Sequence, residues 1–137
     1  MDYSVRPANE GDLPAIERLE GDGGWEPASY LLYDLQVAEA AGEVIGFIAS
    51  RTVGDEGEVL NLVVDPAWRR RGVATRLLET VKAPELFLEV RVSNSPARSL
   101  YSKLGFLEQG RRRDYYVNPI ENAIVMRLSR ILKRVKT

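Results

Sequence analysis

The stretch from Leu60 to Leu78 constrains the fold of this 137-residue chain more than any other. It predicts a β-strand that ends at Asp65-Pro66, a loop of three consecutive arginines, and a helix that starts at Val73, directly after Gly72. Glycine permits close approach to a backbone, and a helix N-terminus offers unpaired N–H groups and a positive dipole. The arginines add charge, so the segment predicts a strand–loop–helix unit that binds an anionic group such as a pyrophosphate.

The composition excludes several kinds of chemistry. The 45% hydrophobic and 28% charged residues are typical of a soluble globular protein, and the length favours one domain over residues 1–137. The chain has no Cys and no His, which excludes zinc sites with thiolate or imidazole ligands, Ser-His-Asp triads and Cys-His pairs. We therefore expect no metal, and any catalysis must use carboxylates, hydroxyls, phenols, amines or backbone dipoles.

Charge is distributed unevenly along the chain. Residues 1–68 hold 14 Asp/Glu and 3 Lys/Arg, whereas residues 69–137 hold 6 Asp/Glu and 16 Lys/Arg. A basic half suits phosphates and an acidic half suits a cationic substrate, unless folding interleaves the two halves into a mixed surface.

No apolar run reaches the roughly 20 residues of a membrane span, and the first residues lack a signal-peptide pattern. These features predict a cytoplasmic protein with no membrane partner.

Hydrophobic periodicity and turn residues predict an α/β domain with a mixed sheet. Asp12 is the expected N-cap of the first helix, with Ile16 and Leu19 on its apolar face. The expected strands cover residues 3–7, 37–40, 43–51, 58–64, 86–92, 106–116 and 123–129. The expected helices cover 13–20, 27–35, 73–82 and 95–104, the last with a buried stripe of Ala97, Leu100 and Leu104.

A second block, Asn94 to Phe106, reads N-S-P-A-R-S-L-Y-S-K-L-G-F. Its spacing and the R-R-R-G-V-A loop after V-D-P together resemble the acetyl-coenzyme A motifs of the GCN5-related N-acetyltransferase (GNAT) superfamily. The wider stretch from Glu58 to Leu128, with L-E-V-R-V, R-R-R-D-Y-Y and N-A-I-V-M-R-L, is similar to the ribosomal-protein-alanine (RimI) type within it. The resemblance implies one GNAT domain with a mostly antiparallel sheet of six to seven strands and about four helices.

The resemblance also implies acetyl-CoA as co-substrate. The backbone of the strand at Leu62, Val63 and Val64 would pair with its pantetheine arm. The pyrophosphate residues implied are Arg69, Arg70, Arg71, Gly72, Val73, Ala74 and Thr75. Asn94 would contact the cofactor and can also serve as a helix cap.

Two residues carry the catalytic roles that the resemblance implies, Glu89 as general base and Tyr101 as general acid. An α-amine has a pKa of about 8 and must lose a proton before it attacks a thioester, and a phenol can protonate the departing thiolate. Alternation along the strand places Glu89 on the face opposite Leu88 and Val90, where a carboxylate is costly unless it is paired or used. Glu58, on the preceding strand, is the competing base.

The implied acceptor is a protein N-terminus, with alanine or another small first residue and with a ribosomal protein among the candidates. Tyr115 and Tyr116 would border the peptide groove, and the opposite wall would hold Glu26 together with Glu20 and Asp22. The helix before Pro84 is short for the family, so we expect a reshaped groove.

Three other interpretations differ in class. One is a GNAT enzyme acting on lysine side chains or a polyamine, and another is a non-catalytic acyl-CoA-binding module. Nucleic-acid binding is not expected, because a coenzyme pyrophosphate is a sufficient partner for the arginine loop. The absence of cysteine favours direct transfer without a thiol-bound acyl-enzyme.

Overall fold

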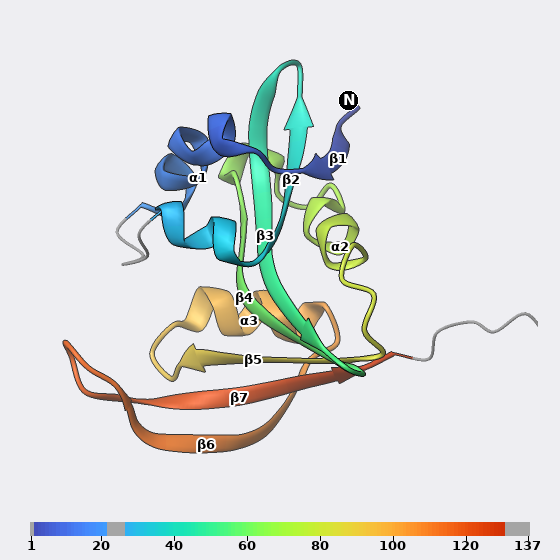
Figure 1. The fold of residues 1–137 in the computed structure, drawn as a ribbon. Helices are drawn as coiled ribbons and strands as arrows, with labels where there is room; N and C mark the ends of the chain where they lie inside the picture. Colours follow the sequence, from blue (N-terminus) through green and yellow to red (C-terminus); the bar gives the residue numbers. More distant parts are fainter. Residues whose placement is uncertain (1, 22–26, 131–137) are drawn as a thin grey trace, which may run out of the picture. The chain divides into compact units, whose positions relative to one another are not determined.

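The computed structural model of this protein describes residues 2–21 and 27–130. The seven strands found within these described residues form a mixed sheet in the order β1-β2-β3-β4-β5-β7-β6 (Figure 1). The β1–β2, β2–β3, β5–β7 and β6–β7 pairs are antiparallel, and β4–β5 is parallel. The expected α/β class with a mostly antiparallel sheet is therefore confirmed.

The chain divides into two compact units, which are described separately below. The first consists of Met1–Arg51 and Val59–Lys82, and the second of Thr52–Glu58 and Ala83–Thr137. None of the helices built from the described residues is long and apolar enough to cross a bilayer.

The first unit is a sheet with a helix on each face (Figure 1). Its elements are β1 (Ser4–Pro7), α1 (Leu13–Glu20), β2 (Asp34–Ala40), most of β3 (Glu43–Val53), most of β4 (Glu56–Val64) and α2 (Val73–Leu78). The short 3₁₀ helices are η1 (Glu10–Asp12), η2 (Pro27–Leu32) and η3 (Pro66–Trp68). The β2–β3 hairpin turns at Ala41 and Gly42, whose φ angles of 49° and 80° suit a two-residue hairpin turn.

The core of the first unit follows the alternation of β2 and β3. Val37 and Phe47 are cross-strand partners and pack with Ile16 of α1 and with Tyr30. On the other face, an added Cβ at Gly46 would lie 3.4 Å from side-chain atoms of both Val73 and Leu77, so α2 packs closely against β3 there.

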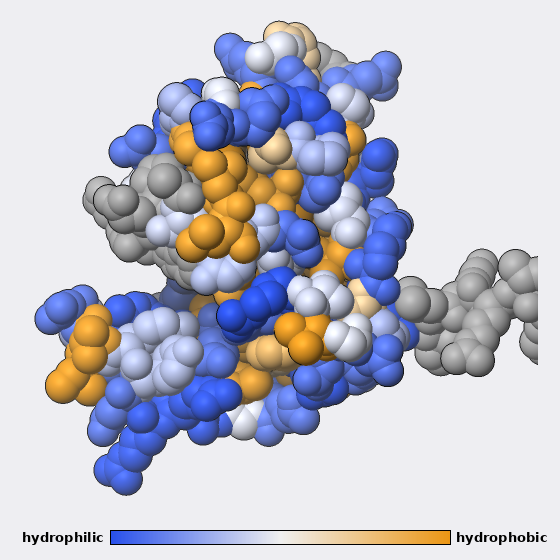
Figure 2. All heavy atoms as spheres, in the orientation of Figure 1, coloured by the Kyte–Doolittle hydropathy of each residue, from blue (hydrophilic) through white to orange (hydrophobic). Residues whose placement is uncertain are grey.

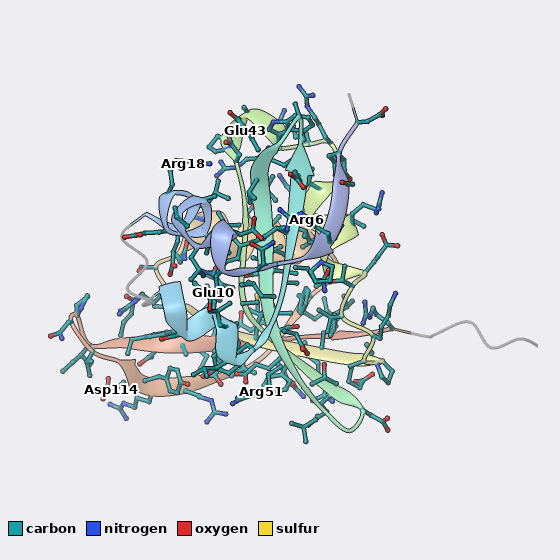
Figure 3. The ribbon with its side chains drawn as sticks, turned by 45° about the horizontal axis from the view of Figure 1, so that its top comes forward. Arg6, Glu10, Arg18, Glu43, Arg51 and Asp114 are labelled. Carbon is teal, nitrogen blue, oxygen red and sulfur yellow. The ribbon has the colours of Figure 1, made fainter. Side chains whose placement is uncertain are left out.

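Ion pairs join β1 to the N-terminal end of α1 and to β2. Arg6 of β1, labelled in Figure 3, donates to both Asp12 carboxylate oxygens at 2.8 and 2.9 Å and to Glu39 at 2.8 Å. Asp12 also accepts from the Asn9 N–H at 2.9 Å. Asp12 holds the expected N-cap position, but its side chain makes no capping bond to α1, because those contacts engage it instead.

The second unit is a sheet covered by one helix among its described residues (Figure 1). It contains β5 (Glu85–Arg91), α3 (Ser95–Lys103), β6 (Leu107–Tyr116) and β7 (Glu121–Ser129). In β5 the side chains of Leu86, Leu88 and Val90 are buried, and those between them are half-buried, as the predicted alternation requires. Figure 2 shows apolar side chains at the tip of the β6–β7 hairpin, where Val117 and Ile120 are exposed.

Three helix predictions need correction. The second expected helix, 27–35, is the shorter 3₁₀ helix η2, and Leu35 already belongs to β2. Helix α2 ends at Leu78 instead of Lys82, because Thr80 and Val81 make tighter i to i−3 bonds to Leu77 and Leu78. In α3 the buried residue is Tyr101, while the expected stripe of Ala97, Leu100 and Leu104 is only half-buried.

Candidate active site

Glu89 lies near the centre of β5, on the face opposite Leu88 and Val90. Its side chain is only 12% exposed. Oε1 lies 3.3 Å from Nε of Arg112, whereas Oε2 is buried and has no hydrogen-bond partner within residues 2–21 and 27–130. A buried carboxylate oxygen without a donor is costly, which makes this atom a candidate proton acceptor.

Two tyrosines at the end of β6 lie beside this carboxylate. Tyr115 and Tyr116 pack edge to face, with ring centroids 5.1 Å apart. A hydrogen bond to Glu89 is the main cause that raises the pKa of Tyr115, and burial adds to it. Burial, followed by the negative charge of Glu89, raises the pKa of Tyr116 to about 12. Both phenols therefore remain protonated near neutral pH.

Tyr101 reaches the same group of side chains from α3. It is 6% exposed, and its ring packs edge to face on Phe106 at a centroid distance of 5.6 Å. Burial raises the pKa of Tyr101, and the neighbouring Tyr116 raises it further. The phenol is thus held in its protonated, donor form.

Glu58 lies in the same unit as Glu89. In the parallel β4–β5 register it is opposite Phe87, which shares a strand face with Glu89. Its charge also contributes to the raised pKa of Tyr115. Both carboxylates therefore raise the pKa of Tyr115, with Glu89 as the largest cause and Glu58 as the smallest.

Asn94 is the N-cap of α3. Its Oδ1 accepts a hydrogen bond from the Ala97 N–H at 3.2 Å. The predicted capping role is confirmed, and the side chain is exposed.

The arginine loop lies in the first unit and leads into α2. Gly72 has φ 78° and Arg70 has φ 64°, both in the left-handed region, so the backbone turns sharply before the helix. At the start of α2 the Arg76 N–H donates to the Gly72 carbonyl at 3.0 Å, and Gly72 provides no side-chain cap. The first-turn N–H groups of Val73, Ala74 and Thr75 precede that bond and face outward along the helix axis.

An aromatic pair that the sequence did not predict packs against arginines of this loop and of α2. Tyr3 and Trp68 pack edge to face at 6.3 Å between ring centroids. The Arg71 guanidinium lies 4.9 Å from the Trp68 ring centroid, and that of Arg76 lies 5.7 Å from the Tyr3 ring centroid. Tyr3 is far from the loop in sequence, so no local pattern could have predicted its part in fixing these cations.

The strand residues Leu62, Val63 and Val64 belong to the first unit's part of β4. Leu62 and Val64 are buried and Val63 is half-buried, as expected for core side chains. The Leu62 N–H donates to Oδ1 of Asn61 at 2.9 Å, and Nδ2 of Asn61 donates to the Tyr30 hydroxyl at 3.0 Å. The Leu62 N–H is thus engaged by a side chain.

The acidic wall predicted for the acceptor groove is described only in part. Glu26 and Asp22 lie outside the described residues. Glu20 is the last residue of α1 and is half-buried. Burial of Tyr30 is the largest cause that raises the pKa of this tyrosine, and the neighbouring Glu20 raises it further.

Residues 4–106 match the family model described as Acetyltransferase (GNAT) family. This chain belongs to that family. The GNAT membership covers both motif blocks, the arginine loop and the segment from Asn94 to Phe106.

Curated relatives of this GNAT chain include two N-acetyltransferases. An N-alpha-acetyltransferase of Sulfurisphaera tokodaii is 41% identical over 110 residues, which cover 66% of this chain and 65% of the relative. The [ribosomal protein bS18]-alanine N-acetyltransferase of Escherichia coli is 38% identical over 96 residues, which cover 64% of this chain and 65% of the relative. The matched part of this GNAT chain therefore spans slightly less than two thirds of the length of each relative.

Solved structures share the GNAT fold over nearly the whole chain. The ribosomal-protein-S18-alanine N-acetyltransferase from Escherichia coli superposes with a TM-score of 0.78 at 29% identity, covering 97% of both chains. A GNAT family acetyltransferase from Elizabethkingia anophelis with acetyl-CoA bound has a TM-score of 0.72 at 21% identity, covering 93% of this chain and 97% of that one. The second likeness concerns the fold alone.

Proposed function

We propose that this GNAT protein transfers an acetyl group from acetyl-CoA directly to the α-amine of a protein N-terminus. The observation that carries the proposal is the Glu89 carboxylate, held at Oε1 by Arg112 and buried without a hydrogen-bond donor at Oε2 within the described residues. The relatives named as N-alpha-acetyltransferase and ribosomal-protein-alanine N-acetyltransferase support the acceptor class.

The residues of the arginine loop fit the pyrophosphate of acetyl-CoA. Arg69, Arg70 and Arg71 are exposed, and the first turn of α2 offers backbone donors without a side-chain cap. A Cβ added at Gly72 would have no neighbour closer than 4.0 Å among the described residues, so the turn leaves room beside the backbone there. Guanidinium groups and oriented N–H groups together are a donor set suited to phosphates. Thr75 and Asn94 would add polar contacts, and the β4 backbone at Leu62, Val63 and Val64 would pair with the pantetheine arm.

When bound, acetyl-CoA would supply an acetyl thioester whose C–S bond breaks as the amide C–N bond forms. Glu89 takes the proton of the attacking amine at Oε2, directly or through a water molecule. An α-amine with a pKa of about 8 is largely protonated at neutral pH, so a neighbouring carboxylate is needed to accept its proton before the amine attacks.

Tyr101 donates the proton that the departing sulfur requires. Burial keeps its phenol protonated, and Tyr116 lies close enough to affect its pKa. General acid catalysis of this kind contributes about 10²- to 10⁴-fold in rate.

The acceptor peptide is proposed to lie along Tyr115 and Tyr116. Their rings lie beside the Glu89 carboxylate, and Tyr115 is partly exposed. Phenol rings present an apolar face and a polar edge, which suits a short peptide backbone. Glu26 is proposed for the same groove, and we propose an N-terminal alanine or another small residue as the acetylated position.

A peptide panel tests this function. The purified protein is incubated with acetyl-CoA and an Ala-initiated peptide, with the same peptide blocked at its α-amine, and with spermidine. We expect CoA release with the free peptide alone. Activity that survives the block would favour lysine acetylation, and activity with spermidine would favour a polyamine acceptor. Acetyl-CoA binding without transfer to any acceptor would favour a non-catalytic binding module.

A further inference from the structure

Arg112 reaches the candidate base from another strand. Glu89 is on β5 and Arg112 is on β6, and β7 runs between them. Glu89 is paired with Val125 and Arg112 with Ala123, two residues apart on β7, so both face the same side of the sheet. Nε of Arg112 lies 3.3 Å from Oε1 of Glu89.

A β-bulge in β6 lets Tyr115 join this pair. Arg112 and Tyr116 are four positions apart, whereas their β7 partners Ala123 and Glu121 are only two positions apart. Asp114, labelled in Figure 3, has a left-handed φ of 49°, and its N–H donates to Oδ1 of Asn122 at 2.9 Å.

In a regular strand Arg112 and Tyr115 would point to opposite faces. The bulge interrupts that alternation, and the Arg112 guanidinium lies 5.6 Å from the Tyr115 ring centroid. Tyr115 also interacts with Glu89, so the three side chains form a closed group.

The geometry points to Arg112 as a positioning residue for Glu89. By holding Oε1, it fixes the carboxylate so that Oε2 is the oxygen that receives the proton of the acceptor amine. This inference rests on the proposed function, in which Glu89 is the base. Arg112 does not touch the reacting atoms in this role and acts through the carboxylate alone.

The pair contributes little to folding, which makes it testable. The Arg112 side chain is 57% exposed, and ion pairs with such an exposed partner add little stability. Arg111, the preceding residue, pairs with Glu108 at 3.0 Å and is also exposed. Arg111→Met is therefore a matched control that removes a guanidinium from the same strand.

The test compares Arg112→Met, Arg112→Lys and Arg111→Met in steady-state acetyl transfer to the Ala-initiated peptide. We expect Arg112→Met to lower kcat about tenfold, with the KM for acetyl-CoA changed less than about twofold. Arg112→Lys keeps the charge and should recover part of the loss, and Arg111→Met should match the wild type. Circular dichroism melting should give the same Tm for all four proteins.

A double-mutant cycle with Glu89→Gln separates positioning from other roles. If Arg112 acts through Glu89, adding Arg112→Met to Glu89→Gln causes no further loss of kcat. An unchanged kcat in Arg112→Met, or the same tenfold loss in the Glu89→Gln background, would overturn the inference while leaving the proposed function intact. A wild-type protein that transfers no acetyl group would instead refute the proposed function, and the inference with it.

Discussion

Arg112 Nε and Glu89 Oε1 lie 3.3 Å apart although the two residues belong to strands that are not neighbours. The pair neutralises one carboxylate oxygen and leaves the other buried without a donor from the described parts of the chain. A carboxylate with one oxygen anchored and one unused is well suited to proton transfer, because its orientation is already set.

Replacing Glu89 with Gln should lower kcat by about 10²- to 10⁴-fold, because the amide cannot accept the proton of the amine. The affinity for acetyl-CoA, measured by titration calorimetry, should stay within about twofold of the wild type. Glu58→Gln is the matched control and should retain most of the activity. A larger loss in Glu58→Gln would transfer the role of base to Glu58.

Replacing Tyr101 with Phe should lower kcat by at least about tenfold without a large change in Tm, because only the hydroxyl of a buried ring is removed. The raised pKa of Tyr101 keeps its protonated form at higher pH than an ordinary phenol. The kcat of the wild type should therefore show no decline from this group up to about pH 10. An unchanged kcat in Tyr101→Phe would exclude it as the acid.

Asp12→Asn should destabilise the fold by about 1–3 kcal/mol at pH 7, because it leaves Arg6 without its bidentate partner. Arg6 holds the pKa of Asp12 below its ordinary value of 3.8. The stabilising contribution is therefore complete above that value and is lost as the pH falls through the lower, folded-state pKa. Urea unfolding at pH 7 and near pH 3 measures this, and an equal difference at both pH values would contradict it.

Gly46→Ala should destabilise the fold by about 1–3 kcal/mol, because the new Cβ would lie 3.0 Å from the Val63 carbonyl oxygen, a backbone atom that can shift only if its strand shifts with it. Gly110→Ala is the control, since an added Cβ there contacts no atom of the described part of the chain within 4 Å. Both are measured by urea unfolding. A Gly46→Ala variant as stable as the wild type would show that β3 and β4 can separate without cost.

Local patterns predicted most of the fold. Alternating side chains located β5 and the face that carries Glu89. The gap between the expected strands 37–40 and 43–51 located the hairpin turn at Ala41 and Gly42. The end of α2 was predicted wrongly, because Pro84 marks only where a helix must stop, whereas Thr80 bonds the carbonyl of Leu77 and ends it earlier.

The partners of the candidate site residues could not be predicted. Arg112 pairs with Glu89 across an intervening strand, and its approach to Tyr115 depends on the bulge at Asp114. Tyr3 meets Trp68 through the packing of distant segments. Period and spacing identify the residue types, but the register and irregularities of a sheet determine which of them meet.

The central claim is acetyl transfer to an α-amine, and one intramolecular competition tests it most directly. A peptide with a free N-terminal alanine and an internal lysine is incubated with acetyl-CoA and the protein, and fragmentation mass spectrometry locates the added acetyl group. We predict one acetyl group on the alanine nitrogen, at a rate that collapses in Glu89→Gln. An acetyl group on the lysine side chain, with the α-amine left free, would contradict the account.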